Sequence, residues 1–171
     1  MPGRNPDESW RAFRDPIITS VRCVDPGAWL NERLFPDGTR LLATPARGIG
    51  FGNALTLTFS FHLEPFQDGA GQWHMSTRRY DYTLATRAHP DEIVFGWHWH
   101  PRSRRSHITY PHVHVPSAST FSTRHIPTGR VALEEIILFG FDDLNVPPAD
   151  ATARTRLTEV LERHKLHRRW S

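Results

Sequence analysis

An alternating run of apolar and polar residues constrains the fold of this chain more than any other feature of its sequence. Residues 54–63 read ALTLTFSFHL. Successive side chains of a β-strand point to opposite faces, so the apolar residues of this run share one face and the polar ones share the other. The pattern predicts a strand with one buried face. Its apolar side chains are Leu55, Leu57, Phe59 and Phe61.

Three later segments have the same character. They span residues 72–86, 92–100 and 108–115, and turn-forming residues separate them. Short strands at this spacing predict an antiparallel meander. We expect a further short strand over residues 17–24, and residues 28–34 fit either a helix or a strand.

The end of the chain has helical periodicity. A first helix is expected over residues 129–145, with Thr128 as its N-cap, and a second over residues 150–166. Strands that precede helices in the chain are typical of α+β proteins. The predicted fold class is therefore α+β: an antiparallel sheet with two C-terminal helices packed on one of its faces.

The length and composition indicate one intracellular domain. We expect residues 1–16 to be a flexible N-terminus and residues 17–171 to form a single α+β domain. Cys23 is the one cysteine, so no internal disulfide can form. The N-terminus lacks the apolar stretch of a secretory signal, and no apolar run approaches the roughly 20 residues of a membrane span. We therefore expect a cytoplasmic protein that does not associate with membranes.

Two His-x-His pairs are the strongest candidates for a functional site. Residues two apart on a strand point the same way, so His98 and His100 share a face, and so do His112 and His114. We expect the two strands to pair with His100 opposite His112 and His98 opposite His114. This register puts all four imidazoles on one face. A shift of two residues would preserve that face.

Clustered imidazoles are suited to acid-base chemistry. Their pKa values start near about 6.5, and neighbouring positive charges lower one another's proton affinity. Some rings then act as acids and others as bases at one pH, as cleavage of RNA through its 2′-hydroxyl requires. The pattern thus favours a metal-independent endoribonuclease that needs no cofactor.

Several residues near the histidines are suited to binding the RNA substrate. Arginine grips phosphate with two parallel hydrogen bonds, and Lys165 is the one lysine among 21 basic side chains. The preference for arginine over lysine could equally arise from the codon usage of the source genome. The candidate substrate-binding residues are Arg102, Arg104, Arg105, Tyr110, Arg124, His125 and Arg130.

Two other functions remain open. The four histidines of the His-x-His pairs are the ligands expected for a zinc or iron ion in a metal-dependent hydrolase or oxygenase. The carboxylates weighed as further ligands are Asp91, Glu92, Glu134 and Glu135, and none stands at a convincing spacing. A non-enzymatic module that binds protein or nucleic acid is the third hypothesis. Each histidine taken alone is more simply a polar residue of a solvated sheet face.

Four short motifs carry a resemblance to a known family. They are YDYTL at residues 80–84, HWHP at 98–101, PHVH at 111–114 and LEEI at 133–136. Residues 75–145 thereby resemble the TumE-like group of small bacterial toxin–antitoxin proteins. The resemblance implies a growth-inhibiting toxin that acts on RNA and is neutralised by a cognate antitoxin protein. It also implies a catalytic site of His98, His100, His112 and His114, with Tyr82 behind them.

Overall fold

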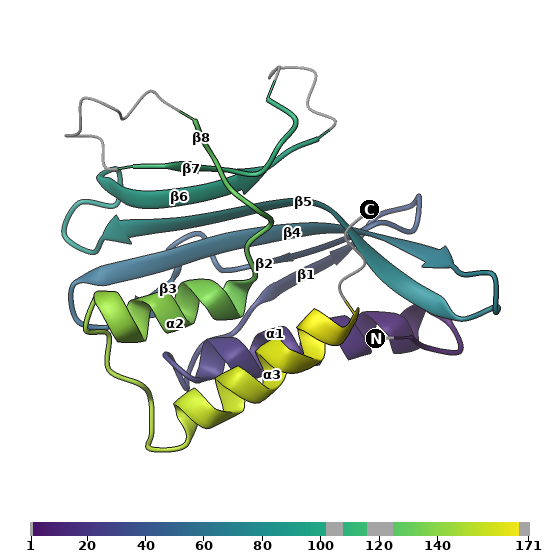
Figure 1. The fold of residues 1–171 in the computed structure, drawn as a ribbon, viewed down its shortest axis with the longest axis horizontal. Helices are drawn as coiled ribbons and strands as arrows, with labels where there is room; N and C mark the ends of the chain where they lie inside the picture. The colour runs from purple at the N-terminus through teal and green to yellow at the C-terminus, as the bar shows by residue number, and fades with distance from the viewer. Residues whose placement is uncertain (1, 102–107, 116–124, 168–171) are drawn as a thin grey trace. The chain divides into compact units, whose positions relative to one another are not determined.

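The protein has an α+β fold, as the order of strands and helices predicts. The computed structural model describes residues 2–101, 108–115 and 125–167. Within these residues lie one eight-stranded antiparallel sheet and three helices, two of them near the C-terminus (Figure 1). Contacts divide the chain into two compact units, and the single domain expected over residues 17–171 stays a prediction. The helical unit comprises Met1–Ala28, Glu64–Ser76 and Ala132–Ser171, and the sheet unit comprises Trp29–Leu63 and Thr77–Val131.

The sheet is a meander with one side branch. Its hydrogen-bonded order is β1-β2-β4-β5-β6-β7-β8, and β3 pairs with β4 (Figure 1). The predicted strands 54–63, 72–86, 92–100 and 108–115 correspond to β4, β5, β6 and β7. The strands are β1 Asn31–Leu34, β2 Arg40–Ala43, β3 Ile49–Phe51, β4 Leu55–Gln67, β5 Trp73–Thr86, β6 Ile93–Trp99, β7 His112–His114 and β8 Ile126–Pro127. The segment that fitted either helix or strand contains β1.

One face of the sheet carries the buried apolar side chains, as the alternation predicts. Leu57, Phe59 and Phe61 of β4 are each at most 4% exposed, whereas Thr58 and Ser60 between them are half-buried. On β5 the alternating residues Tyr80, Tyr82 and Leu84 are buried, as is Ala85 beyond them. The rings of Phe61 and Tyr82 meet edge-on at 5.6 Å between centroids. The polar face of these strands is therefore the face available for a site.

The N-terminal segment is a helix, α1, over Pro6–Arg22. The prediction of a strand over residues 17–24 was wrong, and helix replaces most of the flexible N-terminus expected over residues 1–16. The side chain of Asn5 accepts a hydrogen bond from the Glu8 backbone N–H, which caps the first turn. Trp10, Ile17 and Val21 are buried, and their spacing follows a helical rather than a two-residue repeat. Helical periodicity across residues 10–21 thus outweighs the β-propensity of the short apolar run at residues 17–24.

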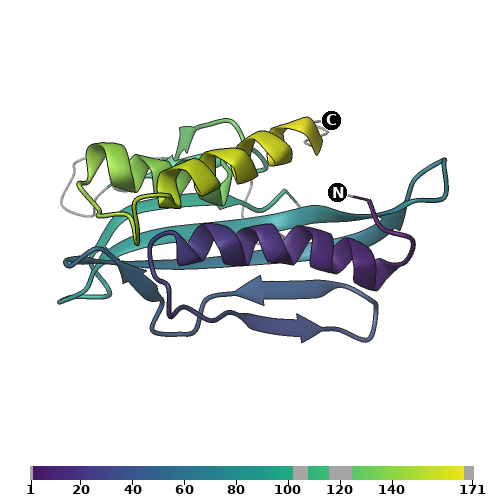
Figure 2. The same cartoon turned by 90° about the horizontal axis from the view of Figure 1, so that it is seen from below.

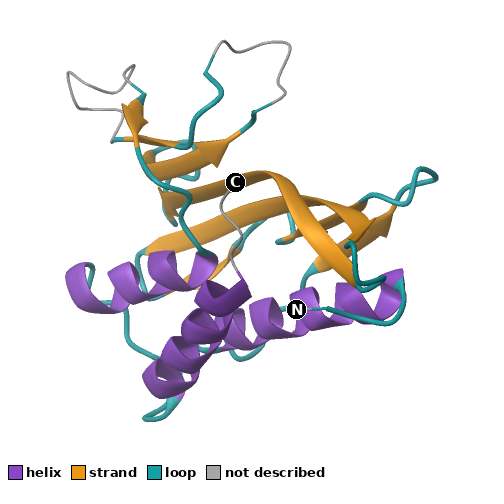
Figure 3. Cartoon of the chain, turned by 45° about the vertical axis from the view of Figure 1, so that its right-hand side comes forward, coloured by secondary structure: helices purple, strands orange, loops and turns teal. Residues whose placement is uncertain are grey.

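The two predicted C-terminal helices are confirmed, but they begin and end at other residues than expected. Helix α2 spans Leu133–Asp143 and α3 spans Ala153–His167. The N-cap of α2 is Ala132, so the predicted cap at Thr128 was wrong. The carboxylate of Glu135 accepts a hydrogen bond from the Ala132 backbone N–H at 2.7 Å. This bond satisfies one of the backbone donors at the start of the helix. Figures 2 and 3 show α1, α2 and α3 from two other sides.

A buried carboxylate lies between the helices of the helical unit. Glu134 has no exposed surface, and its Oε1 accepts a hydrogen bond from Ser20 Oγ at 2.9 Å. His164 Nδ1 is 3.1 Å from Glu134 Oε2, and the His164 ring stacks on Phe13. His164 is thus a packed helix residue, as its place on the apolar stripe of α3 suggests. In the part of the chain that the structure describes, no helix has the length and apolar character needed to cross a membrane.

Candidate functional site

Five histidines and one aspartate converge on the polar face of the sheet unit, and we call this group the histidine face. Most of its members belong to strands β5, β6 and β7, while His100 directly follows β6 and His125 directly precedes β8. The neighbouring strands β6 and β7 are labelled in Figure 1. The members of the histidine face are Asp81, His98, His100, His112, His114 and His125.

The pairing of β6 with β7 is shifted by two residues from the expected register. His98 lies opposite His112, and Gly96 lies opposite His114. The expected pairs of His100 with His112 and His98 with His114 were therefore wrong. A shift of two keeps every side chain on its face, so the prediction of a shared histidine face is confirmed. The long connection between the strands does not fix the register as a tight turn would.

Three of the histidines form a compact group that we call the imidazole triad: His112, His114 and His125. Each offers one ring nitrogen, and these nitrogens lie within 4.8 Å of one another. The ring of His125 lies 4.8 Å from that of His112 and 4.5 Å from that of His114, between centroids. The His112 ring is oriented by a 3.1 Å hydrogen bond between Nδ1 and the Tyr110 carbonyl oxygen. Its Nε2 is therefore the nitrogen left for a ligand.

The other members form a second group around a carboxylate, which we call the Asp81 triad: Asp81, His98 and His100. Asp81 Oδ1 is 2.9 Å from His98 Nδ1 and 2.8 Å from His100 Nε2. Its Oδ2 accepts from Arg79 Nε at 3.0 Å and from Ser60 Oγ at 3.3 Å. Four donors thus surround a carboxylate whose side chain is 22% exposed.

The two triads adjoin through His98. Its ring centroid lies 5.0 Å from that of His114 and 5.7 Å from that of His112. Gly96 makes this position possible, because a Cβ atom at residue 96 would be 2.7 Å from His98 Nε2. The absence of a side chain at Gly96 therefore lets the His98 ring lie between Asp81 and His114.

The electrostatics of the face favour neutral imidazoles beside a charged carboxylate. Burial, reinforced by His98, His125 and His112, lowers the pKa of His114 to about 4. Burial also lowers the pKa of His100 and of His112. Burial would raise the pKa of Asp81, but the His98 hydrogen bond and the charges of His100 and Arg79 lower it to about 2. These shifts favour the neutral form of His100, His112 and His114 and the charged form of Asp81, which are the forms that bind metal ions.

Two predicted site residues, Tyr82 and Arg130, lie away from the histidine face. Tyr82 is 1% exposed on the opposite face, where it pairs with Trp97, and its hydroxyl donates to the Val131 carbonyl at 3.1 Å. The guanidinium of Arg130 lies 3.6 Å from the ring centroid of Trp99, which also belongs to that opposite face. Tyr110 is exposed beside His112. Arg102, Arg104, Arg105 and Arg124 lie outside the described residues.

Sequence reasoning missed the carboxylate of the site. Asp81 stands between Tyr80 and Tyr82, which the pattern assigns to the apolar face, so alternation alone puts Asp81 on the polar face. Its partner His98 follows only from the register of β5 with β6, which pairs Asp81 with His98. His125 was expected to bind substrate, and the structure places it in the imidazole triad.

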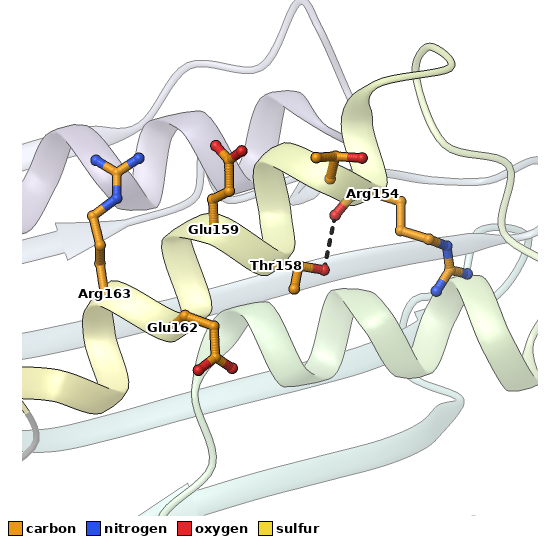
Figure 4. A pocket seen from close by; sticks show the side chains of 6 residues that line it. Arg154, Thr158, Glu159, Glu162 and Arg163 are labelled. Carbon is orange, nitrogen blue, oxygen red and sulfur yellow. Dashed lines mark hydrogen bonds between the residues drawn. The ribbon is translucent and has the colours of Figure 1, made fainter.

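A shallow hollow elsewhere carries no candidate chemistry. It is lined by side chains of α3 alone, and Figure 4 shows five of them labelled along that helix. The hydrogen bond drawn there joins Thr158 Oγ1 to the Arg154 carbonyl, which is local to the helix. None of the lining residues belongs to the histidine face.

Comparison with protein-family models, curated proteins and solved structures finds no match for this chain. The resemblance to the TumE-like group therefore stays a prediction.

Proposed function

We propose that the histidine face is a metal-dependent hydrolytic centre in which the imidazole triad holds a divalent transition metal. The observation that carries this proposal is the convergence of the three ring nitrogens of His112, His114 and His125 within 4.8 Å. Three protein ligands that leave a coordination position open are typical of catalytic zinc. The hydrogen bond of His112 to a backbone carbonyl is the usual support of a metal-bound imidazole.

When bound, the metal would act as a Lewis acid and activate a water molecule. The substrate we propose is RNA, in the cytoplasm, as the arginine-rich composition and the family resemblance suggest. In hydrolysis the water oxygen forms a bond to phosphorus and the bond from phosphorus to one sugar oxygen breaks. One water proton passes to that leaving oxygen, and the phosphate monoester releases the other to solvent. The three imidazoles of the triad would hold the ion, with the His112 ring oriented by its hydrogen bond to the Tyr110 carbonyl.

Metal analysis of untagged protein tests the proposal, because a polyhistidine tag would bind metal itself. We expect the imidazole triad to bind one Zn²⁺ ion, and we expect its zinc affinity to fall in His112→Ala because one of three ligands is lost. The matched control is His62→Ala, because His62 is a half-buried residue of β4 outside both triads. Equal zinc affinity in the wild type and in His112→Ala would refute the proposal.

A metal-independent ribonuclease is the second candidate, and one observation favours it. His98 Nδ1 is bound to Asp81, which leaves Nε2 as a proton acceptor on the open face. Under this hypothesis RNA cleavage survives exhaustive chelation and is lost in His98→Ala but retained in His125→Ala. The metal-dependent centre predicts the reverse for chelation, since zinc removal abolishes cleavage and zinc addition restores it.

The toxin hypothesis has its own test. Expression of the wild-type chain is expected to arrest growth, and His112→Ala is expected to relieve the arrest if the histidine face causes it. A neutralising partner protein would then act by covering this face. Arrest that persists in His112→Ala at equal protein levels would separate toxicity from the proposed centre.

A further inference from the structure

We propose that the Asp81 triad is a second metal site beside the first, so that the histidine face holds two metal ions. The site needs only Asp81, His98 and His100, whereas its catalytic use rests on the function proposed above. The substrate class it indicates is a phosphoester, because pairs of metal ions about 3.5–4 Å apart are typical of enzymes that hydrolyse phosphoesters.

The convergence of the ligand atoms is the first observation. His98 approaches Asp81 with Nδ1, and His100 approaches it with Nε2, yet both nitrogens are directed at the same oxygen, Oδ1. The three candidate ligand atoms lie within 4.8 Å of one another, which is close enough for one cation to bind all three.

The support behind Asp81 is the second observation. Its other oxygen, Oδ2, is held by Arg79 Nε and Ser60 Oγ, from the same strand and from neighbouring β4. Hydrogen bonds of this kind fix the orientation of a metal-bound carboxylate and are costly to remove. They leave Oδ1 directed at the two imidazoles.

The donor set is the third observation. Two imidazoles and one carboxylate bind divalent iron, manganese, cobalt or zinc and leave several coordination positions open. This set includes a charged oxygen that the imidazole triad lacks, so the two sites have different preferences. The 5.0 Å separation of the His98 and His114 rings makes the sites neighbours on one face. A phosphoester that bridged them would present one oxygen to each ion.

Cobalt counting tests the proposal. Untagged protein is stripped with chelator and titrated with Co²⁺, and the bound ions are counted by native mass spectrometry and by visible absorption. We expect two ions in the wild type, one in Asp81→Asn, one in His125→Ala and none in the double variant. The matched control is Thr58→Ala, because Thr58 is a half-buried β4 residue of the same polar face and belongs to neither triad. This control is expected to keep both ions.

The outcomes separate the two proposals. One ion in the wild type that survives Asp81→Asn and is lost in His125→Ala refutes the second site and leaves the first. One ion that survives His125→Ala and is lost in Asp81→Asn refutes the first site and leaves the second. No ion in the wild type refutes both. Far-ultraviolet circular dichroism and thermal melts establish that each variant is folded, and His98→Gln provides a second variant if Asp81→Asn is not.

Discussion

Asp81 and Glu134 both contact histidine, and they have opposite surroundings. Asp81 is partly exposed on the histidine face, contacts four polar side chains and adjoins the imidazole triad. Glu134 is fully buried among helices, with Ser20 and His164 as its neighbours. A carboxylate and a histidine in contact thus stabilise the fold where both are enclosed. They can support chemistry where the imidazoles stay open to further ligands.

The largest effect on folding is expected at the enclosed carboxylate. Glu134→Ala removes one of the two acceptors of Ser20 Oγ and the neighbour of His164, and it leaves a cavity. Breaking a buried polar pair of this kind costs about 3 kcal/mol of unfolding free energy. Urea denaturation measures the loss. The control is Glu159→Ala on the exposed side of α3, where about 0.5 kcal/mol or less is expected. A loss at Glu134 no larger than that of the control would contradict the role of its pairings.

Acid is expected to destabilise the metal-free protein through the histidine face. The pKa of His114 is about 4 when folded, against an ordinary value of 6.5, so the unfolded chain takes up this proton first. Stability therefore falls as the pH drops from 6.5 towards 4. For Asp81, with a folded pKa of about 2, the contribution is lost between pH 3.8 and 2. Urea midpoints of the wild type and His114→Gln check this, since the variant should lose less between pH 6.5 and 4. This explanation would be ruled out if NMR showed that the His114 ring titrates near its ordinary pKa.

Gly96 tests whether the position of His98 matters on the open face. A methyl group there would lie 2.7 Å from His98 Nε2 and would displace the ring from Asp81. We expect Gly96→Ala to weaken Co²⁺ binding at the Asp81 triad about tenfold, which corresponds to about 1.4 kcal/mol. Gly129→Ala is the control, because a Cβ atom at residue 129 has no neighbour within 4 Å. Unchanged cobalt affinity in Gly96→Ala would show that His98 does not depend on this space.

The sequence predicted which residues lie on the polar face better than it predicted which of them are neighbours there. Alternation over residues 54–63 and the two His-x-His pairs gave the strands and the side on which the imidazoles lie. That inference needs only the two-residue repeat of a strand. The register of β6 with β7 was wrong by two, because both registers keep the same residues on the same face.

Long-range contacts account for what the sequence could not predict. Asp81 joins the site because β5 pairs with β6, and His125 joins because the chain returns beside β7 after a long connection. Glu134 falls within the helix predicted over residues 129–145, but that pattern does not reveal its burial. Its burial depends on α1 and α3, which are distant in sequence. Such contacts leave no local periodicity to detect.

The smallest effect is expected at Tyr82, on the face opposite the histidines. Tyr82→Phe removes one hydrogen bond, from the phenol to the Val131 carbonyl, and keeps the ring. The expected cost is about 1 kcal/mol of unfolding free energy, measured in urea. Cobalt affinity should be unchanged, because the backbone of β5 separates this side chain from Asp81. Loss of cobalt binding in folded Tyr82→Phe would mean that the two faces are coupled, and the contrast between enclosed and open groups would then fail at this strand.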